Sequence, residues 1–252
     1  MDSDHVMRPD ADFWHFMPSR YLTDVIDRRL FHFKNVRGYN ENNFINVDGR
    51  LFSAESLAYF SFSRDPDCTI KHYFWKRYGD NGLGVAVGFR QAGWRQDSGP
   101  IATIAFAHSD RQVSNLYLPA KDSSGTTRKC FYSMVFYSYS VTASPLASEA
   151  PNEDDLLWSN EICFTEKPPE DAPDTEERLI LLGCTKSENI DYSPMRPYLY
   201  PKAIVFGYNM PASQRDQTLE QYLGKFLLFQ SESKEQRIEL RILEQYGNSH
   251  AP

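Results

Sequence analysis

Three groups of polar residues in this sequence have types and spacings that binding or catalysis could use. His15 lies between two aromatic residues near the start of the chain. Ser61 and Ser63 alternate with Tyr59, so an extended strand would place all three side chains on one face. Glu176 lies in the acidic stretch DTEER, just before the apolar run that starts at Leu179. A polar strand face with aromatic residues nearby could line a ligand pocket, and a fixed carboxylate could stabilise developing positive charge.

Each group also has a structural interpretation, which the residues alone leave open. His15 would then be a core histidine with one hydrogen bond to the backbone. The serines would lie on a solvated strand face. Glu176 would belong to an exposed acidic loop, residues 174–178, in which Arg178 pairs with a neighbouring acid. A competing carboxylate is Glu161, which lies between a tryptophan and an apolar run.

Several common catalytic and metal-binding motifs do not occur in the sequence. It contains no GxGxxG after a strand, no Walker A, no GxSxG and no HExxH. The 4 cysteines show no CxxC spacing, and the acidic residues 152–155 lack metal-ligand spacing. We therefore expect no metal cofactor.

Composition narrows the classes of partner and compartment. The chain has 252 residues and a formal net charge of -7, which argues against broad nucleic-acid binding. Its N-terminus is polar and acidic, and no apolar run reaches the length of about 20 residues that a membrane helix needs. Scattered single cysteines fit a reducing compartment. We expect a cytoplasmic protein that does not enter a membrane.

The order of short apolar runs and turn signals predicts a mixed α+β fold with many strands and few helices. We expect flexible tails at residues 1–12 and 246–252, and one domain over residues 13–245. Ser19 should cap a short helix with the apolar stripe Leu22, Val25 and Ile26. The aromatic run over residues 129–141 fits either a helix or a strand.

The order of His15, the hydroxyl-bearing strand and Glu176 resembles that of the ADP-ribosyltransferase fold. The resemblance implies two small packed antiparallel sheets and NAD as a substrate, with no metal. It implies that His15 binds the adenine-side ribose, that Glu176 binds the nicotinamide ribose, and that Asp174 orients or deprotonates the acceptor. Further candidates for contacting NAD are Ser19, Tyr21, Tyr59, Ser61, Ser63, Trp75 and Tyr78.

A second resemblance covers most of the chain from residue 13 to residue 210. The run FWKRYGDNGLGVAVGF is similar to the signature of a bacterial family known as domain of unknown function 2971. The matching residues are Phe60, Ser61, Trp75, Tyr78, Gly79, Asp80, Asn81, Gly84 and Val85. Lys167, residues 174–178 and the run YPKAIVFGYNM match the later signature of that family.

These patterns predict an NAD-dependent mono-ADP-ribosyltransferase, a bacterial toxin or antiphage effector that acts on a protein or nucleic-acid acceptor. An antitoxin or another regulatory partner would fit that role. A basic groove for a nucleic acid would come from Arg20, Arg28, Arg29, Lys34 and Arg37. One alternative is a non-catalytic nucleotide- or partner-binding module, which the aspartate at position 174 favours. The other is a metal-dependent nuclease or hydrolase.

Overall fold

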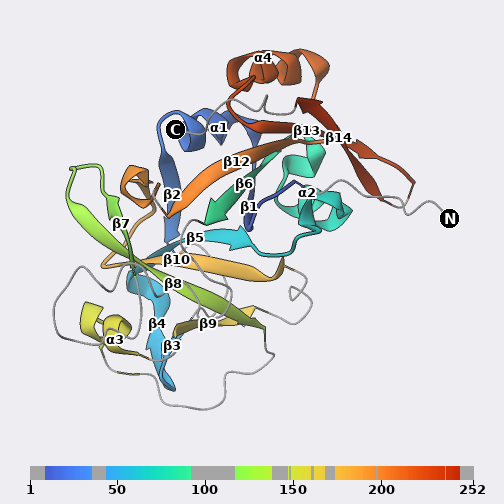
Figure 1. Ribbon diagram of the computed structural model, residues 1–252. Helices are drawn as coiled ribbons and strands as arrows, with labels where there is room; N and C mark the ends of the chain where they lie inside the picture. The colour runs from blue at the N-terminus through green and yellow to red at the C-terminus, as the bar shows by residue number, and fades with distance from the viewer. Residues whose placement is uncertain are drawn as a thin grey trace. The chain divides into compact units, whose positions relative to one another are not determined.

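A computed structural model shows two compact units formed by alternating parts of the chain (Figure 1). Unit 1 comprises Met1–Asp27, Ser63–Arg90 and Tyr200–Pro252, and unit 2 comprises Arg28–Phe62 and Gln91–Leu199. The structure describes residues 9–35, 44–91, 117–137, 147, 149–159, 162–167, 174–196, 198–235 and 237–244. Glu161, Arg37 and the C-terminal tail lie outside the described residues.

Strands dominate both units, and the described helices are short. The helices are α1 (Leu22–Ile26), α2 (His72–Arg77), α3 (Glu153–Trp158) and α4 (Ala212–Tyr222). The first strands are β1 (Phe13–Met17), β2 (Leu30–Asn35), β3 (Phe44–Val47), β4 (Arg50–Ser53), β5 (Leu57–Ser63), β6 (Val85–Gln91) and β7 (Tyr117–Lys121). The later strands are β8 (Thr127–Tyr137), β9 (Ile162–Lys167), β10 (Glu176–Leu182), β11 (Glu188–Asp191), β12 (Leu199–Phe206), β13 (Leu227–Ser233) and β14 (Ile238–Glu244). The mixed α+β class is therefore confirmed, and residues 129–137 form a strand.

Unit 2 is built around a closed barrel of six strands, so the expectation of two small sheets was wrong. The strands follow one another in the order β5, β2, β11, β7 and β8, and β10 closes the ring by pairing with both β8 and β5. Within this ring, β2 is antiparallel to β5 and β11, β7 is antiparallel to β11 and β8, and β8 is antiparallel to β10. Closure removes the free edges that two separate sheets would leave.

The barrel interior is filled by large aromatic side chains. Strand alternation places Phe31 and Phe33 of β2 inside, whereas the alternate residues His32 and Lys34 are exposed. Stacked rings join Phe31 to Phe60 of β5, at 4.1 Å between centroids, and to Tyr192, at 4.0 Å. Burial of these rings contributes apolar stabilisation to the closed ring.

The outer face of β5, β8 and β10 carries a second apolar layer. Its buried residues come from the barrel strands and from β3, β4 and α3: Ile45, Val47, Phe52, Leu57, Tyr59, Phe131, Val135, Leu156 and Ile180. Helix α3 begins with a capping box, in which Asn152 accepts from the backbone of Asp155 and the Asp155 side chain accepts from the backbone of Asn152. These strands are therefore covered on both faces, which buries whatever polar side chains they carry.

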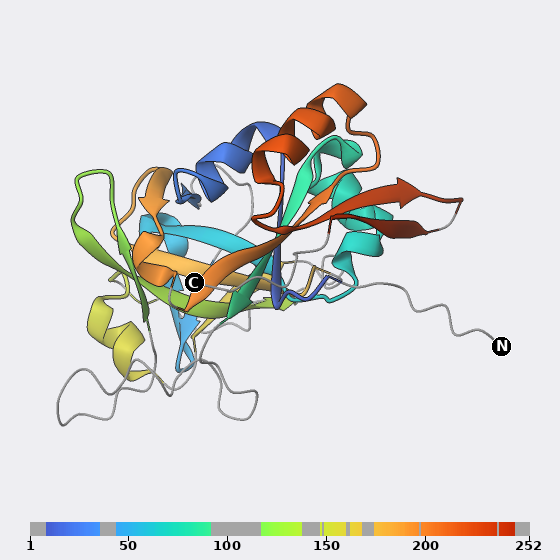
Figure 2. The ribbon, with the colours of Figure 1, turned by 45° about the horizontal axis from the view of Figure 1, so that its top comes forward.

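Unit 1 contains the strand order β14, β13, β12, β6 and β1, with β12 and β13 parallel. Helix α4 connects those two parallel strands and lies beside α1 (Figure 2). The Tyr222 hydroxyl donates to Asp27 just after α1, at 2.9 Å. Ser19 does not cap a helix. It belongs to a 3-10 turn before α1, and its hydroxyl accepts from Gln214 Nε2 at 2.6 Å.

Residues 9–12 of the expected N-terminal tail are joined to β6. The Asp12 amide donates to the Phe89 carbonyl at 2.8 Å, and Arg90 pairs with both Asp10 and Asp12. Ordered structure in unit 1 therefore begins before β1.

Two glycine-rich turns of unit 1 pack against each other without room for side chains. A Cβ on Gly207 would lie 2.2 Å from the Gly82 carbonyl oxygen, and one on Gly84 would lie 2.3 Å from the Met17 carbonyl oxygen. The Gly207 amide also donates to the Gly84 carbonyl at 3.0 Å. Close backbone contact therefore accounts for Gly84 and Gly207.

We expect Gly207→Ala to lower the free energy of unfolding by at least about 2 kcal/mol, because rigid backbone opposes the new methyl group. Gly125→Ala is the control: Gly125 has a φ of +83° and open space around it, so only its backbone conformation costs energy, about 1 kcal/mol. Urea unfolding of both variants measures the difference. Equal effects would contradict the tight packing of the two turns.

Candidate functional site

Ser61 and Glu176, which are 115 residues apart in the sequence, form a hydrogen bond in unit 2. The Ser61 hydroxyl on β5 donates to Glu176 Oε1 at the start of β10, at 2.5 Å. Glu176 is only 8 % exposed, so the carboxylate is not part of a solvated acidic loop. The barrel creates this contact because β10 pairs with β5.

Arg178 and Tyr59 complete the cluster around Glu176. Arg178 Nε donates to the same Glu176 Oε1 at 2.7 Å, and its guanidinium carbon lies 4.0 Å from the centre of the Tyr59 ring. Arg178 is 2 % exposed and Tyr59 is 7 % exposed. A guanidinium over an aromatic face is held by cation–π attraction as well as by its ion pair. We call Tyr59, Ser61, Glu176 and Arg178 the Glu176 cluster.

Buried acids outnumber buried bases in residues 174–178. Asp174, Glu176 and Glu177 are each less than 9 % exposed, and Arg178 is the one buried base of this stretch. Glu177 alternates with Glu176 along β10 and therefore faces the barrel interior. Burying carboxylates is costly unless positive charge or hydrogen bonds compensate. Within this stretch, Arg178 supplies positive charge to Glu176.

The backbone directly before Glu176 is strained. Thr175 is exposed and has a φ of +40°, in the left-handed region. A β-branched residue rarely occupies that region, because its side chain crowds the backbone. Strain of this kind persists only where surrounding structure enforces it, and it is common at functional sites. It fixes the chain direction as β10 begins.

The predicted NAD contacts of the first chain segment lie in unit 1. His15 is half-buried on β1 and pairs with Val87 of β6, while its neighbours Trp14 and Phe16 belong to the apolar core of unit 1. Tyr21 is 45 % exposed. The structure does not make His15 a fully buried core residue, and its role stays a prediction.

Of the other predicted contacts in unit 1, Ser63 and Trp75 are buried. Ser63 accepts a hydrogen bond from the Asp65 amide at 3.2 Å. Trp75 is fully buried, and its indole N–H donates to the Thr69 carbonyl at 2.8 Å. Tyr78 is half-buried beside Arg77, whose guanidinium lies 5.5 Å from its ring centre. Trp75 is thus a core side chain in this structure, whereas Tyr21 keeps an exposed ring.

Sequence reasoning treated Arg178 as the local partner of an exposed acid and did not single out Thr175. The spacing of two residues between Glu176 and Arg178 was the available signal, because a strand places such residues on the same face. No sequence pattern indicates the left-handed backbone of Thr175. Its conformation comes from tertiary structure.

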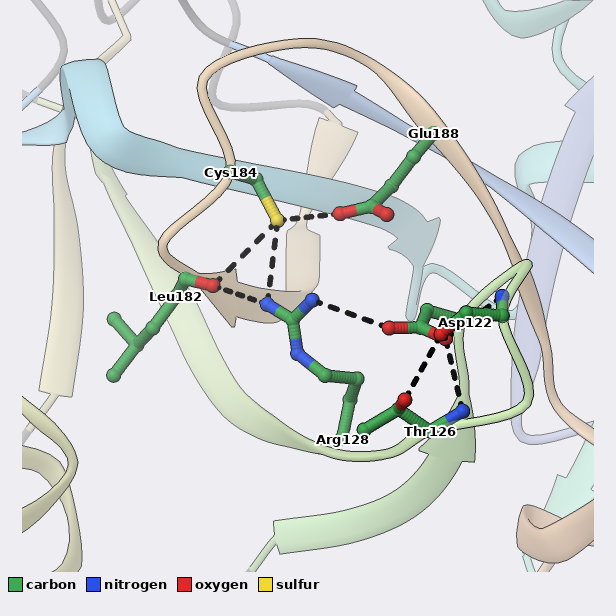
Figure 3. Close-up of polar contacts among 7 residues, drawn as sticks. Asp122, Thr126, Arg128, Leu182, Cys184 and Glu188 are labelled. Carbon is green, nitrogen blue, oxygen red and sulfur yellow. Dashed lines mark hydrogen bonds and ion pairs between the residues drawn. The ribbon is translucent and has the colours of Figure 1, made fainter.

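A second polar cluster lies in unit 2 where β7 and β8 join (Figure 3). Arg128 donates to the Leu182 carbonyl at 2.5 Å and lies 3.8 Å from Asp122. The Cys184 thiol donates to Glu188 Oε1 at 2.6 Å. Burial, followed by the hydrogen bond to Glu188 and its negative charge, raises the pKa of Cys184 to about 12. A thiol that stays protonated is a poor nucleophile, which argues against a catalytic role for Cys184. We interpret the hydrogen bonds of this cluster as structural contacts between strand ends.

Asn35 forms a second set of hydrogen bonds between strands near Cys184. Its side-chain amide donates to three carbonyl oxygens, those of Glu55, Leu57 and Cys184, at 3.2, 2.9 and 2.5 Å. Asn35 is 7 % exposed, so these hydrogen bonds connect β2, β5 and the segment after β10 out of solvent. They connect the start of β5 with the segment that follows β10, and so help to keep the two strands of the Glu176 cluster in register.

Two searches of the described residues bear on other functions. None of their His, Cys, Asp and Glu side chains gather in threes as a metal site would require. None of the described helices has the length and apolar character needed to cross a membrane.

Comparison of the chain with protein-family models, curated proteins and solved structures finds no match. The resemblances to the ADP-ribosyltransferase fold and to domain of unknown function 2971 therefore stay predictions.

We expect Arg178→Met to lower the free energy of unfolding by about 3–5 kcal/mol, because it leaves the buried Glu176 carboxylate without its ion pair. Adding Glu176→Gln should restore part of the loss, since the remaining group is then neutral. Arg237→Met is the matched control: its pair with Glu239 is 61 % and 43 % exposed, and its loss should cost less than about 1 kcal/mol. Chemical unfolding of these three variants and of Glu176→Gln alone measures the coupling between the two residues, and strict additivity of their effects would contradict it.

We expect Cys184 to resist alkylation by iodoacetamide at pH 8. With a pKa of about 12, far less of the thiol is ionised than at an ordinary cysteine, which should slow labelling by about three orders of magnitude. Glu188→Gln removes the charge that opposes ionisation and should speed labelling. Timed labelling read by peptide mass spectrometry tests this, with buried Cys68 of unit 1 as internal control. Labelling of wild-type Cys184 at the rate of a free thiol would contradict it.

Proposed function

We propose that this protein is an NAD-dependent mono-ADP-ribosyltransferase whose reacting centre includes the Glu176 cluster. The observation that carries the proposal is the hydrogen bond from Ser61 to Glu176 at 2.5 Å. Both residues were selected from sequence as parts of one site, from distant segments and for different reasons. Their contact in the folded chain supports that pairing over two unrelated surface groups.

The charge of the cluster fits the reaction. The nicotinamide ring of NAD is positively charged, and positive charge moves to the ribose as the glycosidic bond breaks. A carboxylate fixed before the reaction stabilises that charge without reorganising. Two donors to Oε1 and the strained Thr175 backbone fix Glu176 in this way.

The proposed reaction breaks the bond between ribose C1′ and the nicotinamide nitrogen, which keeps the electron pair and leaves neutral. The acceptor nucleophile then forms a bond to C1′ and loses a proton. Asp174 is the candidate base, at 3 % exposure and two residues before Glu176. The hydroxyls of the nicotinamide ribose would lie against Glu176.

The acceptor in this proposal is a protein or a nucleic acid, with a toxin or antiphage role and an antitoxin as a fitting regulator. The net charge of -7 favours a protein acceptor. Of the predicted basic residues, Arg28, Arg29 and Lys34 are exposed in unit 2. They are accessible to an acidic partner.

The second candidate function is a non-catalytic module that binds a nucleotide or a partner. The buried ion pair between Arg178 and Glu176, at 2.7 Å, favours it, because a carboxylate paired in this way also serves to stabilise a fold. Such a module would bind NAD or a related nucleotide without releasing nicotinamide.

Nicotinamide release from NAD by the purified protein, with cell lysate as the source of acceptor, tests the proposal. We expect Glu176→Gln to lower kcat by about 10²- to 10³-fold, because it removes the charge that stabilises the transition state. The control is Glu149→Gln, an exposed residue of the same unit, which should keep wild-type activity. NAD binding without release favours the binding module. If the protein releases no nicotinamide and NAD does not shift its Tm, the transferase proposal is ruled out.

A further inference from the structure

We infer that Arg178 is a positioning residue for Glu176, and that Tyr59 acts through Arg178 by supporting its guanidinium. This inference rests on the proposed function, since it assigns a role within the same site. Tyr59 was expected among the residues that contact NAD. The structure instead places its ring face 4.0 Å from the Arg178 guanidinium carbon.

The geometry defines what Arg178 does to the carboxylate. Arg178 Nε and the Ser61 hydroxyl both donate to Oε1 of Glu176, at 2.7 and 2.5 Å. Two donors from two different strands restrain the rotation of the carboxylate, which a single donor would not. The orientation of Oε2, the other oxygen, is then set as well.

Packing holds Arg178 in turn. It is 2 % exposed, and on β8 its backbone partner is Ser133, which is 1 % exposed. A long side chain with many rotamers has one position here, because the Tyr59 ring covers its flat face. The guanidinium is planar and always charged, so it meets a ring and a carboxylate at once, whereas a lysine ammonium cannot reproduce both contacts.

Arg178 also acts on the charge of Glu176. Burial disfavours an ionised carboxylate, and an adjacent positive charge favours it. Among the described residues, the charged or titratable groups of this part of unit 2 include Arg178 and Tyr59 in the cluster, Asp174 before β10, and Glu177 on the opposite face of β10. Lys34 of β2 is the cross-strand partner of Tyr59 and is exposed. Arg178 is the cation that contacts Glu176 directly. Without it, the acid form of Glu176 would persist to higher pH.

The test is the pH profile of nicotinamide release for the wild-type protein, Arg178→Gln and Arg178→Lys. For Arg178→Gln we expect kcat to fall at least about tenfold, with the KM for NAD changed less than about twofold. The acid limb of its kcat profile should move to higher pH by about one unit or more, because the carboxylate has lost its cation. Arg178→Lys should return the limb towards the wild-type position and recover only part of kcat.

Arg237→Gln is the control, because Arg237 forms an exposed pair with Glu239 and should leave kcat and the profile unchanged. A lower Tm for Arg178→Gln with wild-type kcat and an unmoved acid limb would overturn the inference and leave Arg178 a structural residue. If Arg178→Gln does not fold, Arg178→Lys and Tyr59→Leu decide: a lower kcat at unchanged KM supports the inference, and wild-type kinetics overturn it. Absence of release from the wild-type protein overturns the proposed function itself, and this inference with it.

Discussion

Strand β10 imposes the constraint on which unit 2 depends. It must pair with β8 on one side and with β5 on the other for the barrel to close, yet its first three residues are Glu176, Glu177 and Arg178. Charged side chains on a strand covered on both faces are costly unless they are compensated locally. The ion pair and the hydrogen bond from Ser61 provide that compensation on the outer face. Closure of the barrel and assembly of the Glu176 cluster are thus one event.

The inner and outer faces of the barrel strands have different roles: the inner face stabilises the fold, and the outer face carries the polar groups of the candidate site. Inside, stacked rings such as Phe31, Phe60 and Tyr192 supply apolar burial that needs no polar partner. On the outer face, alternate residues of β5 and β10 carry the hydroxyl of Ser61, the carboxylate of Glu176 and the guanidinium of Arg178. Because strand periodicity is two, a rigid aromatic interior fixes the direction of every outer side chain. A site on such strands is held more precisely than a site on loops.

The Glu176 cluster and the second polar cluster of unit 2, around Arg128, Cys184 and Glu188, use similar groups for different purposes. In both, an arginine binds beside a carboxylate or a carbonyl oxygen in unit 2. At Cys184, burial and a neighbouring carboxylate raise the pKa of the thiol to about 12, so its nucleophilicity is suppressed. At Glu176, the neighbouring groups are a cation and a hydroxyl donor, which favour the charged carboxylate. The two clusters therefore differ in the sign of the charge that contacts the central group. A carboxylate contacts the Cys184 thiol, which has a structural role, whereas a guanidinium contacts Glu176, the candidate reacting group.

The sequence by itself determined the α+β class, most strands, and the choice of Ser61 and Glu176, because alternation and apolar runs are local signals. It also determined that an arginine follows Glu176 at the same-face spacing. Only the tertiary structure decided that the strands close into a barrel, since closure depends on pairing between segments more than a hundred residues apart. It alone placed Tyr59 against Arg178 and Trp75 in a core, and it put the left-handed backbone at Thr175. Such contacts depend on the partner that packing supplies, which no local pattern specifies.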